Sequence, residues 1–173
     1  DIKILLEDVP YFRDHWLSRN REIDRAWTPQ YGRELKTKTS RTYRGTILEH
    51  MLAQNLVQFF NVGPHNHIRL ENADWNDGLD MAAKYGESVA FTSMYGRNLE
   101  LICEMVEQLG QDKITVLKEL RILLDSITSS PIDYDDINQK HRLLNSYFNA
   151  VKTEVSGEKI TVSKDDLISD LMT

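Results

Sequence analysis

The chain has 173 residues, of which 40% are hydrophobic and 28% charged, so it has the size and composition of one folded domain. The net charge of -6 argues against a nucleic-acid surface, which needs clustered Lys and Arg. No apolar run is long enough to cross a bilayer. A single cysteine, Cys103, excludes an internal disulfide, and its helical apolar neighbours predict a buried structural thiol.

In chain order, residues 1–41 show no sustained hydrophobic period and are predicted to be mostly loop, with at most a short strand or helical turn at Ile2–Leu6. A helix is predicted from Thr42, because apolar residues then recur at three- and four-residue spacing. Asn61 and Gly63-Pro64 end it. The following stretch, Pro64–Tyr85, is predicted to be a loop.

Helical patterns continue to the end of the chain, broken by Gly110, by Pro131 and by Gly157. The helices are predicted at 87–109, 112–126 and 134–155, followed by a short extended piece at 159–162 and a last helix opened by Ser163 with Asp166. Glu87 could reach the site formed by the preceding loop, but it also stands where the first turn of a helix favours an acid, and this helix-start role is preferred. This pattern predicts an all-α fold of antiparallel helical hairpins, and it allows a helical bundle equally well.

The side chains best suited to binding and catalysis are concentrated in the predicted loop, where residues 73–78 read Ala-Asp-Trp-Asn-Asp-Gly. Asp74, Trp75, Asn76 and Asp77 place two carboxylates, an amide and a large ring in four consecutive positions. This composition is suited to binding a sugar and to protonating a glycosidic oxygen. A calcium loop is a poorer match, because the EF-hand positions for Gly and Glu hold other residues in either register.

This loop, followed by Gly-Glu-Ser-Val at 86–89, resembles the signature of the inverting β-glycoside phosphorylases of glycoside hydrolase family 94. That group contains cellobiose, chitobiose and β-1,2-oligoglucan phosphorylases, with the β-1,3-glucan phosphorylases as close relatives. The stretch 45–50 is similar to the helix that leads into the same loop. The resemblance implies that residues 1–173 are the central segment of an (α/α)6 catalytic barrel, and thus a fragment of a larger enzyme. Its phosphate-binding residues would then lie mostly outside this segment, so the isolated segment is expected to be inactive.

By the same resemblance, Asp77 is the general acid, and it needs a raised pKa to stay protonated near neutral pH. Trp75 is expected to contact the sugar, with anchoring of the loop as the alternative role. Asp74 and Asn76 are expected to contribute to substrate binding or to cap local turns, and the sequence leaves both roles open.

Two histidines precede the signature, at His65 and His67. A zinc site would need a third ligand that the sequence does not supply, so hydrogen-bonding loop histidines are favoured. His67 is therefore assigned to substrate binding, where it would contact an acceptor sugar, and no metal is expected.

The resemblance implies reversible phosphorolysis of a β-linked gluco-oligosaccharide, giving α-glucose 1-phosphate. Inorganic phosphate is the co-substrate and no cofactor is expected, because phosphate is already an anionic nucleophile. The residues before and after the signature put β-1,2 and β-1,3 oligoglucans slightly ahead of cellobiose.

Two alternatives remain open: an inverting glycoside hydrolase on the same barrel, and a non-catalytic carbohydrate-binding helical module. The expected partners are the oligosaccharide and phosphate, with no nucleic acid and no membrane. A homodimer of the full-length enzyme is allowed. The resemblance also predicts a cytoplasmic location, because phosphorolysis uses cellular phosphate.

Overall fold

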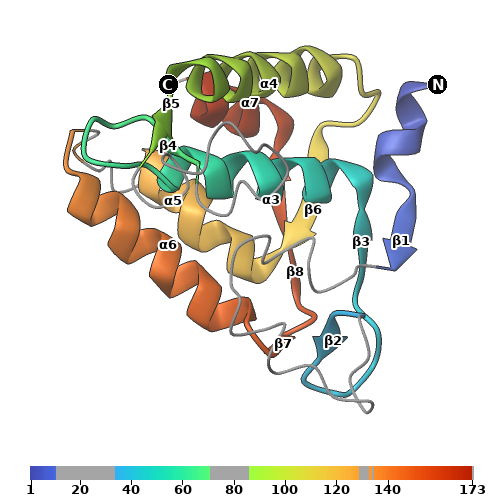
Figure 1. Cartoon of the computed structure of the whole chain (residues 1–173). Coiled ribbons are helices and arrows are strands. Elements are labelled where there is room, and N and C mark those ends of the chain that lie inside the picture. Colours follow the sequence, from blue (N-terminus) through green and yellow to red (C-terminus); the bar gives the residue numbers. More distant parts are fainter. Residues whose placement is uncertain (11–33, 71–85, 129–132, 134, 173) are drawn as a thin grey trace, which may run out of the picture.

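A computed structural model describes residues 1–10, 34–70, 86–128, 133 and 135–172 of the chain (Figure 1). The helices are α3 (Ile47–Phe60), α4 (Val89–Glu107), α5 (Arg121–Thr128), α6 (Ile137–Val151) and α7 (Lys164–Met172), with 3-10 helices η1 (Ile2–Leu6) and η3 (Lys118–Leu120). The strands are β1 (Asp8–Pro10), β2 (Lys36–Thr37), β3 (Arg44–Thr46), β4 (Ile68–Arg69), β5 (Glu87–Ser88), β6 (Lys113–Leu117), β7 (Glu154–Val155) and β8 (Lys159–Ser163).

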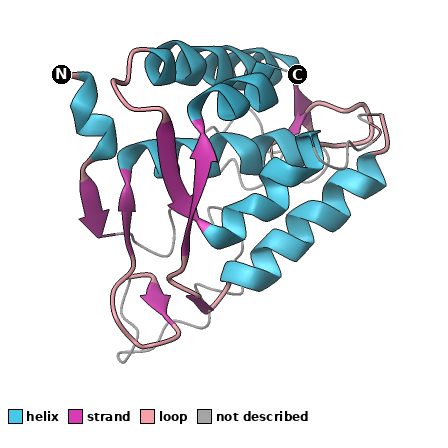
Figure 2. Cartoon of the chain, turned by 180° about the vertical axis from the view of Figure 1, so that it is seen from behind, coloured by secondary structure: helices cyan, strands magenta, loops and turns pink. Residues whose placement is uncertain are grey.

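The strands form two-stranded sheets, which makes the predicted all-α fold of helical hairpins wrong. Three pairs are antiparallel, β1 with β3, β4 with β5 and β6 with β8, and β2 runs parallel to β7. Figure 2 shows the longest pair, β6 and β8, running alongside one another between the helices. The described part of the chain is therefore a mixed fold in which short sheets connect the helices.

Helix α3 lies at the centre of the molecule, with α4 and α7 on one side and α5 and α6 on the other (Figure 1). Leu48, Leu52, Leu56 and Phe60 follow one another at four-residue spacing and are completely buried. Thr46 caps the helix, since its side chain accepts a hydrogen bond from Glu49 N at 3.1 Å. The helix was predicted to begin at Thr42, but residues 44–46 instead pair with β1 as β3.

The predicted helix at 112–126 is wrong in its first half. Lys113–Leu117 is strand β6, and Ile114 and Val116 face the core while Lys113 and Thr115 are exposed. Its five residues pair with β8 in the register Lys113↔Ser163 to Leu117↔Lys159. The apolar residues of this segment fit a period of two as well as a helical period, and the distant partner strand decides between them.

The other predicted elements differ mainly at their ends. Helix α6 is shorter than the predicted 134–155, because Asp136 caps its start and Glu154–Val155 pairs with β2. The short turn at Ile2–Leu6, the helix within 87–109 and the extended piece at 159–162 are confirmed. So is the last helix, where Ser163 Oγ accepts a hydrogen bond from Asp166 N at 3.4 Å.

Cys103 lies on the buried side of α4 and is 3% exposed, which confirms the predicted structural thiol. Burial raises the pKa of this thiol, so the reactive thiolate is disfavoured. None of the described helices combines the length and the hydrophobicity that a membrane span requires.

Candidate functional site

Strands β4 and β5 form a short hairpin. In the sequence they flank the stretch 71–85, which contains the signature and is called the signature segment below. Ile68 pairs with Ser88 and Arg69 with Glu87, and Leu70 N donates to Gly86 O at 3.0 Å. The hairpin thus joins the two ends of the stretch 71–85. The predicted site residues Asp74, Trp75, Asn76 and Asp77 fall within that stretch and lie outside the described residues.

Before the hairpin, the chain makes a tight turn over residues 63–67. Gly63 N donates to His67 O and Asn66 N donates to Gly63 O, each at 2.9 Å. This 63–67 turn brings the predicted loop histidines next to β5, which follows them in the sequence by some twenty residues. Sequence reasoning placed the histidines in a loop and did not foresee this pairing.

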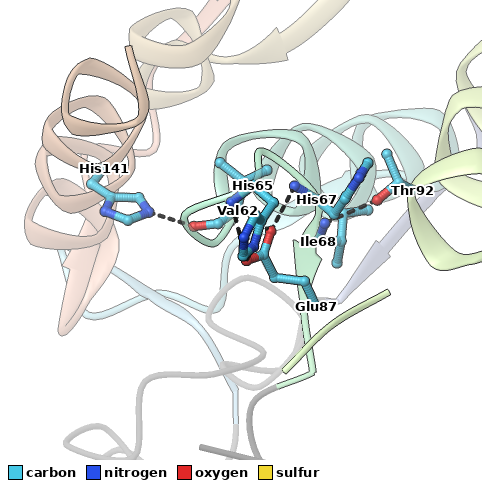
Figure 3. Close-up of polar contacts among 7 residues, drawn as sticks. All are labelled: Val62, His65, His67, Ile68, Glu87, Thr92 and His141. Carbon is cyan, nitrogen blue, oxygen red and sulfur yellow. Dashed lines mark hydrogen bonds and ion pairs between the residues drawn. The ribbon is translucent and has the colours of Figure 1, made fainter. Parts of the chain in front are cut away.

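The carboxylate of Glu87 lies against the 63–67 turn (Figure 3). It accepts hydrogen bonds from His65 N at 3.1 Å, from His67 N at 3.0 Å and from His65 Nδ1 at 2.9 Å. The side chain of Glu87 is only 8% exposed, whereas that of His65 is 83% exposed. The acid therefore has its oxygens occupied by the turn, and one of its hydrogen bonds comes from the largely exposed imidazole ring of His65.

This arrangement corrects the helix-start role predicted for Glu87. The N-terminus of α4 is capped by Ser88, whose Oγ accepts from Phe91 N at 3.1 Å, and the first turn of the helix contains no acid. Burial acts to raise the pKa of Glu87, but the hydrogen bonds from His67 and His65 outweigh it and hold the pKa below its ordinary value. Glu87 is thus held as a carboxylate.

Gly63 makes this approach of Glu87 to the turn sterically feasible. A Cβ atom at position 63 would lie 2.4 Å from Glu87 Cδ and 2.5 Å from its Cγ, distances that atoms do not tolerate. The glycine predicted only to end the preceding helix therefore also makes room for the acid.

Helix α6 supports the opposite side of the same turn. Lys140 Nζ donates to Asn66 Oδ1 at 2.7 Å and lies 4.8 Å from the centre of the Phe59 ring, and His141 Nε2 donates to Val62 O at 2.7 Å. Lys140 is 4% exposed, and this burial lowers its pKa. Sequence reasoning missed Lys140, although it shares one helical face with the buried Leu144, Tyr147 and Val151.

Helix α4 holds the start of β4 through one threonine. Thr92 Oγ1 accepts from Ile68 N at 2.9 Å and donates to Ser88 O at 2.8 Å, so it connects the two strands of the hairpin (Figure 3). Three helices therefore fix the hairpin: α3 runs into it, α4 leaves from it and α6 supports the turn beside it.

His67, the predicted substrate-binding residue, is held by its backbone, and its ring Nδ1 is buried. No other described residue forms a hydrogen bond with that nitrogen. His65, in contrast, hydrogen bonds as expected for a loop histidine. Within the described ranges, no three His, Cys, Asp or Glu side chains come together as a metal site would require.

A hollow of about 190 Å³ opens between the end of α3, β4 and α6. Its polar lining comes from Asn61, Arg69, His141 and Asn145, and its apolar lining from Val57, Leu144 and Phe148. Arg69 is the residue that pairs with Glu87 in the hairpin, so the hollow adjoins the strand that leads into the signature segment.

Residues 28–129, more than half of the chain, match the family described as the glycosyl hydrolase 94 superfamily, catalytic domain. This chain belongs to the glycosyl hydrolase 94 superfamily. The matched span contains α3, the 63–67 turn, the hairpin, the signature segment and α4. Among curated proteins, no sequence matches this chain.

For this glycosyl hydrolase 94 chain, membership supports a function of the glycoside phosphorylase or hydrolase type. The resemblance noted from residues 74–78 and 86–89 is therefore confirmed at the level of the superfamily.

Proposed function

We propose that this chain forms part of an inverting β-glycoside phosphorylase, in which Asp77 is the general acid. Asp77 donates a proton to the glycosidic oxygen while an oxygen of inorganic phosphate attacks the anomeric carbon. The bond between that carbon and the leaving sugar breaks, and the β-linkage becomes α-glucose 1-phosphate. The same steps in reverse build a β-linked glucan from that donor.

The observation that carries this proposal is the position of the signature. The run Asp-Trp-Asn-Asp-Gly at 74–78 falls within the family match and lies in the sequence between β4 and β5, whose backbone pairing holds both ends of 71–85 together. Trp75, Asp74 and Asn76 bind the sugar in this proposal, and His67 contributes its ring from the adjoining turn. His67 is favoured for this role because its backbone, whose N–H donates to Glu87 at 3.0 Å, is fixed in the turn directly before the hairpin.

The substrates are a β-linked gluco-oligosaccharide and inorganic phosphate, without a further cofactor. We favour β-1,2 and β-1,3 oligoglucans over cellobiose, because of the residues that flank the signature. We place the reaction in the cytoplasm, where phosphate is abundant, and we assign the groups that bind phosphate to parts of the catalytic domain outside these 173 residues.

The test is phosphate release from α-glucose 1-phosphate by the full-length gene product. Glucose and a panel of β-linked oligosaccharides serve as acceptors, beside the variants Asp77→Asn and, as matched control, Asp112→Asn on the exposed surface. We expect release that depends on one class of acceptor, and a loss on the order of 100-fold or more in Asp77→Asn alone, as for removal of a general acid.

Equal release by wild type and Asp77→Asn would remove Asp77 from the mechanism. Absence of release with every acceptor, while oligosaccharides still bind, would favour the hydrolase or the non-catalytic binding module.

A further inference from the structure

The hollow between the end of α3, strand β4 and helix α6 is lined by side chains that the proposed reaction does not use. The lining comes from three elements, with Val57 and Asn61 at the end of α3, Arg69 in β4, and His141, Leu144, Asn145 and Phe148 in α6. The four residues of α6 follow one another at three- and four-residue spacing, so they share one face of the helix. We call this site the α6 hollow.

The three walls of the α6 hollow are fastened to one another by hydrogen bonds to backbone oxygens. Arg69 N donates to Asn61 O at 3.1 Å, which joins β4 to the residue that ends α3. His141 Nε2 donates to Val62 O at 2.7 Å, which joins α6 to the same stretch (Figure 3). The walls are therefore set before any ligand arrives, as in most small-molecule sites.

The lining divides into an accessible part and a buried part. The accessible part is formed by the exposed Asn145 and by the half-buried Arg69, His141 and Phe148. The buried part is formed by Val57, Asn61 and Leu144. A guanidinium, an imidazole, an amide and an aromatic ring are thus all within reach of a molecule that enters from solvent.

These groups combine hydrogen bonding with an apolar wall. Arg69 and Asn145 carry several N–H donors in planar arrangements, and Asn145 also carries an acceptor oxygen. Val57, Leu144 and Phe148 supply apolar surface beside them. A sugar ring has matching chemistry, because it carries hydroxyl groups around its edge and C–H groups on its faces. The Phe148 ring suits such a face, and the planar polar groups suit pairs of neighbouring hydroxyls.

Other classes of small ligand match this lining less well. None of the described lining residues is an acid, so an amine or a metal ion would meet the charge of Arg69 without compensation. An inorganic anion would pair with Arg69 but would place its charge against the apolar wall. A purely apolar ligand would bury the guanidinium and the amides without hydrogen-bond partners.

The size of the α6 hollow limits what it holds. Its volume of about 190 Å³ is below the roughly 300–1,000 Å³ of pockets that enclose drug-sized molecules. One ring fits this space better than a chain of rings does. Sugars are also the ligands that membership of a glycoside-active superfamily leads us to expect in the surroundings of this chain.

We propose that the α6 hollow binds one hexopyranose ring, either free or as one unit of an oligosaccharide. The ring lies with one face against Phe148 and with its hydroxyl groups on Arg69 and Asn145. Residues of the hollow alone carry this inference, since none of them belongs to the signature segment. The inference goes beyond the proposed phosphorolysis and would hold equally for a hydrolase.

The test places a reporter inside the hollow of the full-length gene product. Phe148 is replaced by fluorophenylalanine, and fluorine NMR follows its single resonance. Glucose, cellobiose and sodium phosphate are added in separate titrations, so that phosphorolysis does not consume the sugar. We expect a saturable shift with both sugars, at dissociation constants on the order of millimolar for one ring, and no shift with phosphate.

A pair of asparagines on α6 supplies the variant and its control. Asn145→Ala removes a hydrogen-bonding group from an exposed position, and it should raise the dissociation constant of glucose on the order of fivefold. Asn149→Ala lies on the same helix, is also exposed and is not part of the lining, so it should bind glucose as wild type does.

The inference is overturned if neither sugar shifts the resonance saturably. It is overturned as well if glucose binds equally to wild type and Asn145→Ala, since the fluorine would then report binding elsewhere. A shift with phosphate and not with sugars would replace it with an anion site. Its failure is distinct from that of the proposed function, because an inactive phosphorylase with a responsive resonance would keep the hollow, and an active one with a silent resonance would remove it.

Discussion

At the scale of single residues, Glu49 is the most unusual acid in the described structure. It lies in the first turn of α3, has no exposed surface, and accepts hydrogen bonds from Tyr43 Oη at 2.7 Å and from Leu117 N at 2.8 Å. It therefore links the central helix to strand β6, which lies 68 residues further along the chain. Burial raises the pKa of Glu49 from 4.5 to about 7, against the opposing effect of these hydrogen bonds.

This shift makes stability depend on pH, with a sign that follows from proton binding. Between pH 4.5 and about 7 the folded chain holds a proton on Glu49 that the unfolded chain has released. The free energy of unfolding therefore falls as the pH rises through this window and is steady above it. From pH 5 to pH 8 the free energy of unfolding should decrease by about 2 to 3 kcal/mol through this effect.

Glu49→Gln should remove that pH dependence, since glutamine does not titrate. The measurement is urea unfolding of wild type, Glu49→Gln and the exposed control Glu104→Gln at pH 5, 6, 7 and 8. The difference in unfolding free energy between wild type and Glu49→Gln should change steadily with pH, while the unfolding free energy of Glu104→Gln should follow that of wild type. A constant difference at all four pH values would show that Glu49 does not carry the raised pKa.

At the scale of elements, the 63–67 turn depends on the absence of a side chain at Gly63. Gly63→Ala would press a methyl group into Glu87, and we expect overpacking to cost about 1 to 3 kcal/mol of unfolding free energy. Gly96→Ala is the matched control, because an added Cβ there meets nothing within 4 Å. Inside helix α4 it should stabilise the chain by up to about 1 kcal/mol.

Denaturant unfolding of the two variants beside wild type makes the comparison. The free energy of unfolding should decrease in Gly63→Ala and increase in Gly96→Ala. Equal effects of the two substitutions would contradict the tight fit between Gly63 and Glu87.

Local patterns in the sequence were sufficient for α3, α4 and α7, where the apolar residues keep a helical spacing and a cap residue stands at the start. They failed for β6, because its partner β8 lies more than forty residues later and no local pattern encodes that pairing. The same limit applies to the site. The signature could be found because it is a contiguous sequence motif. The contacts of Glu87 with His65 and of Lys140 with Asn66 join residues 22 and 74 positions apart, so no local pattern predicts them.

At the scale of the whole molecule, the family match and the folded core do not end at the same place. The match stops at residue 129, but the core continues through buried residues of α6, β7 and α7, namely Leu144, Tyr147, Val151, Val155 and Leu167. Helix α6 also supplies Lys140 and His141 to the turn beside the signature. The part of the chain beyond the match thus packs against the matched part and helps to shape the candidate site.

The central claim is that this superfamily member transfers a glucosyl group to phosphate and not to water. The most direct measurement is NMR analysis of the products when the full-length gene product acts on β-1,2 and β-1,3 oligoglucans and cellobiose, with and without inorganic phosphate. We predict α-glucose 1-phosphate when phosphate is present and no sugar release when it is absent. Release of free glucose at the same rate without phosphate would contradict the account and identify an inverting hydrolase.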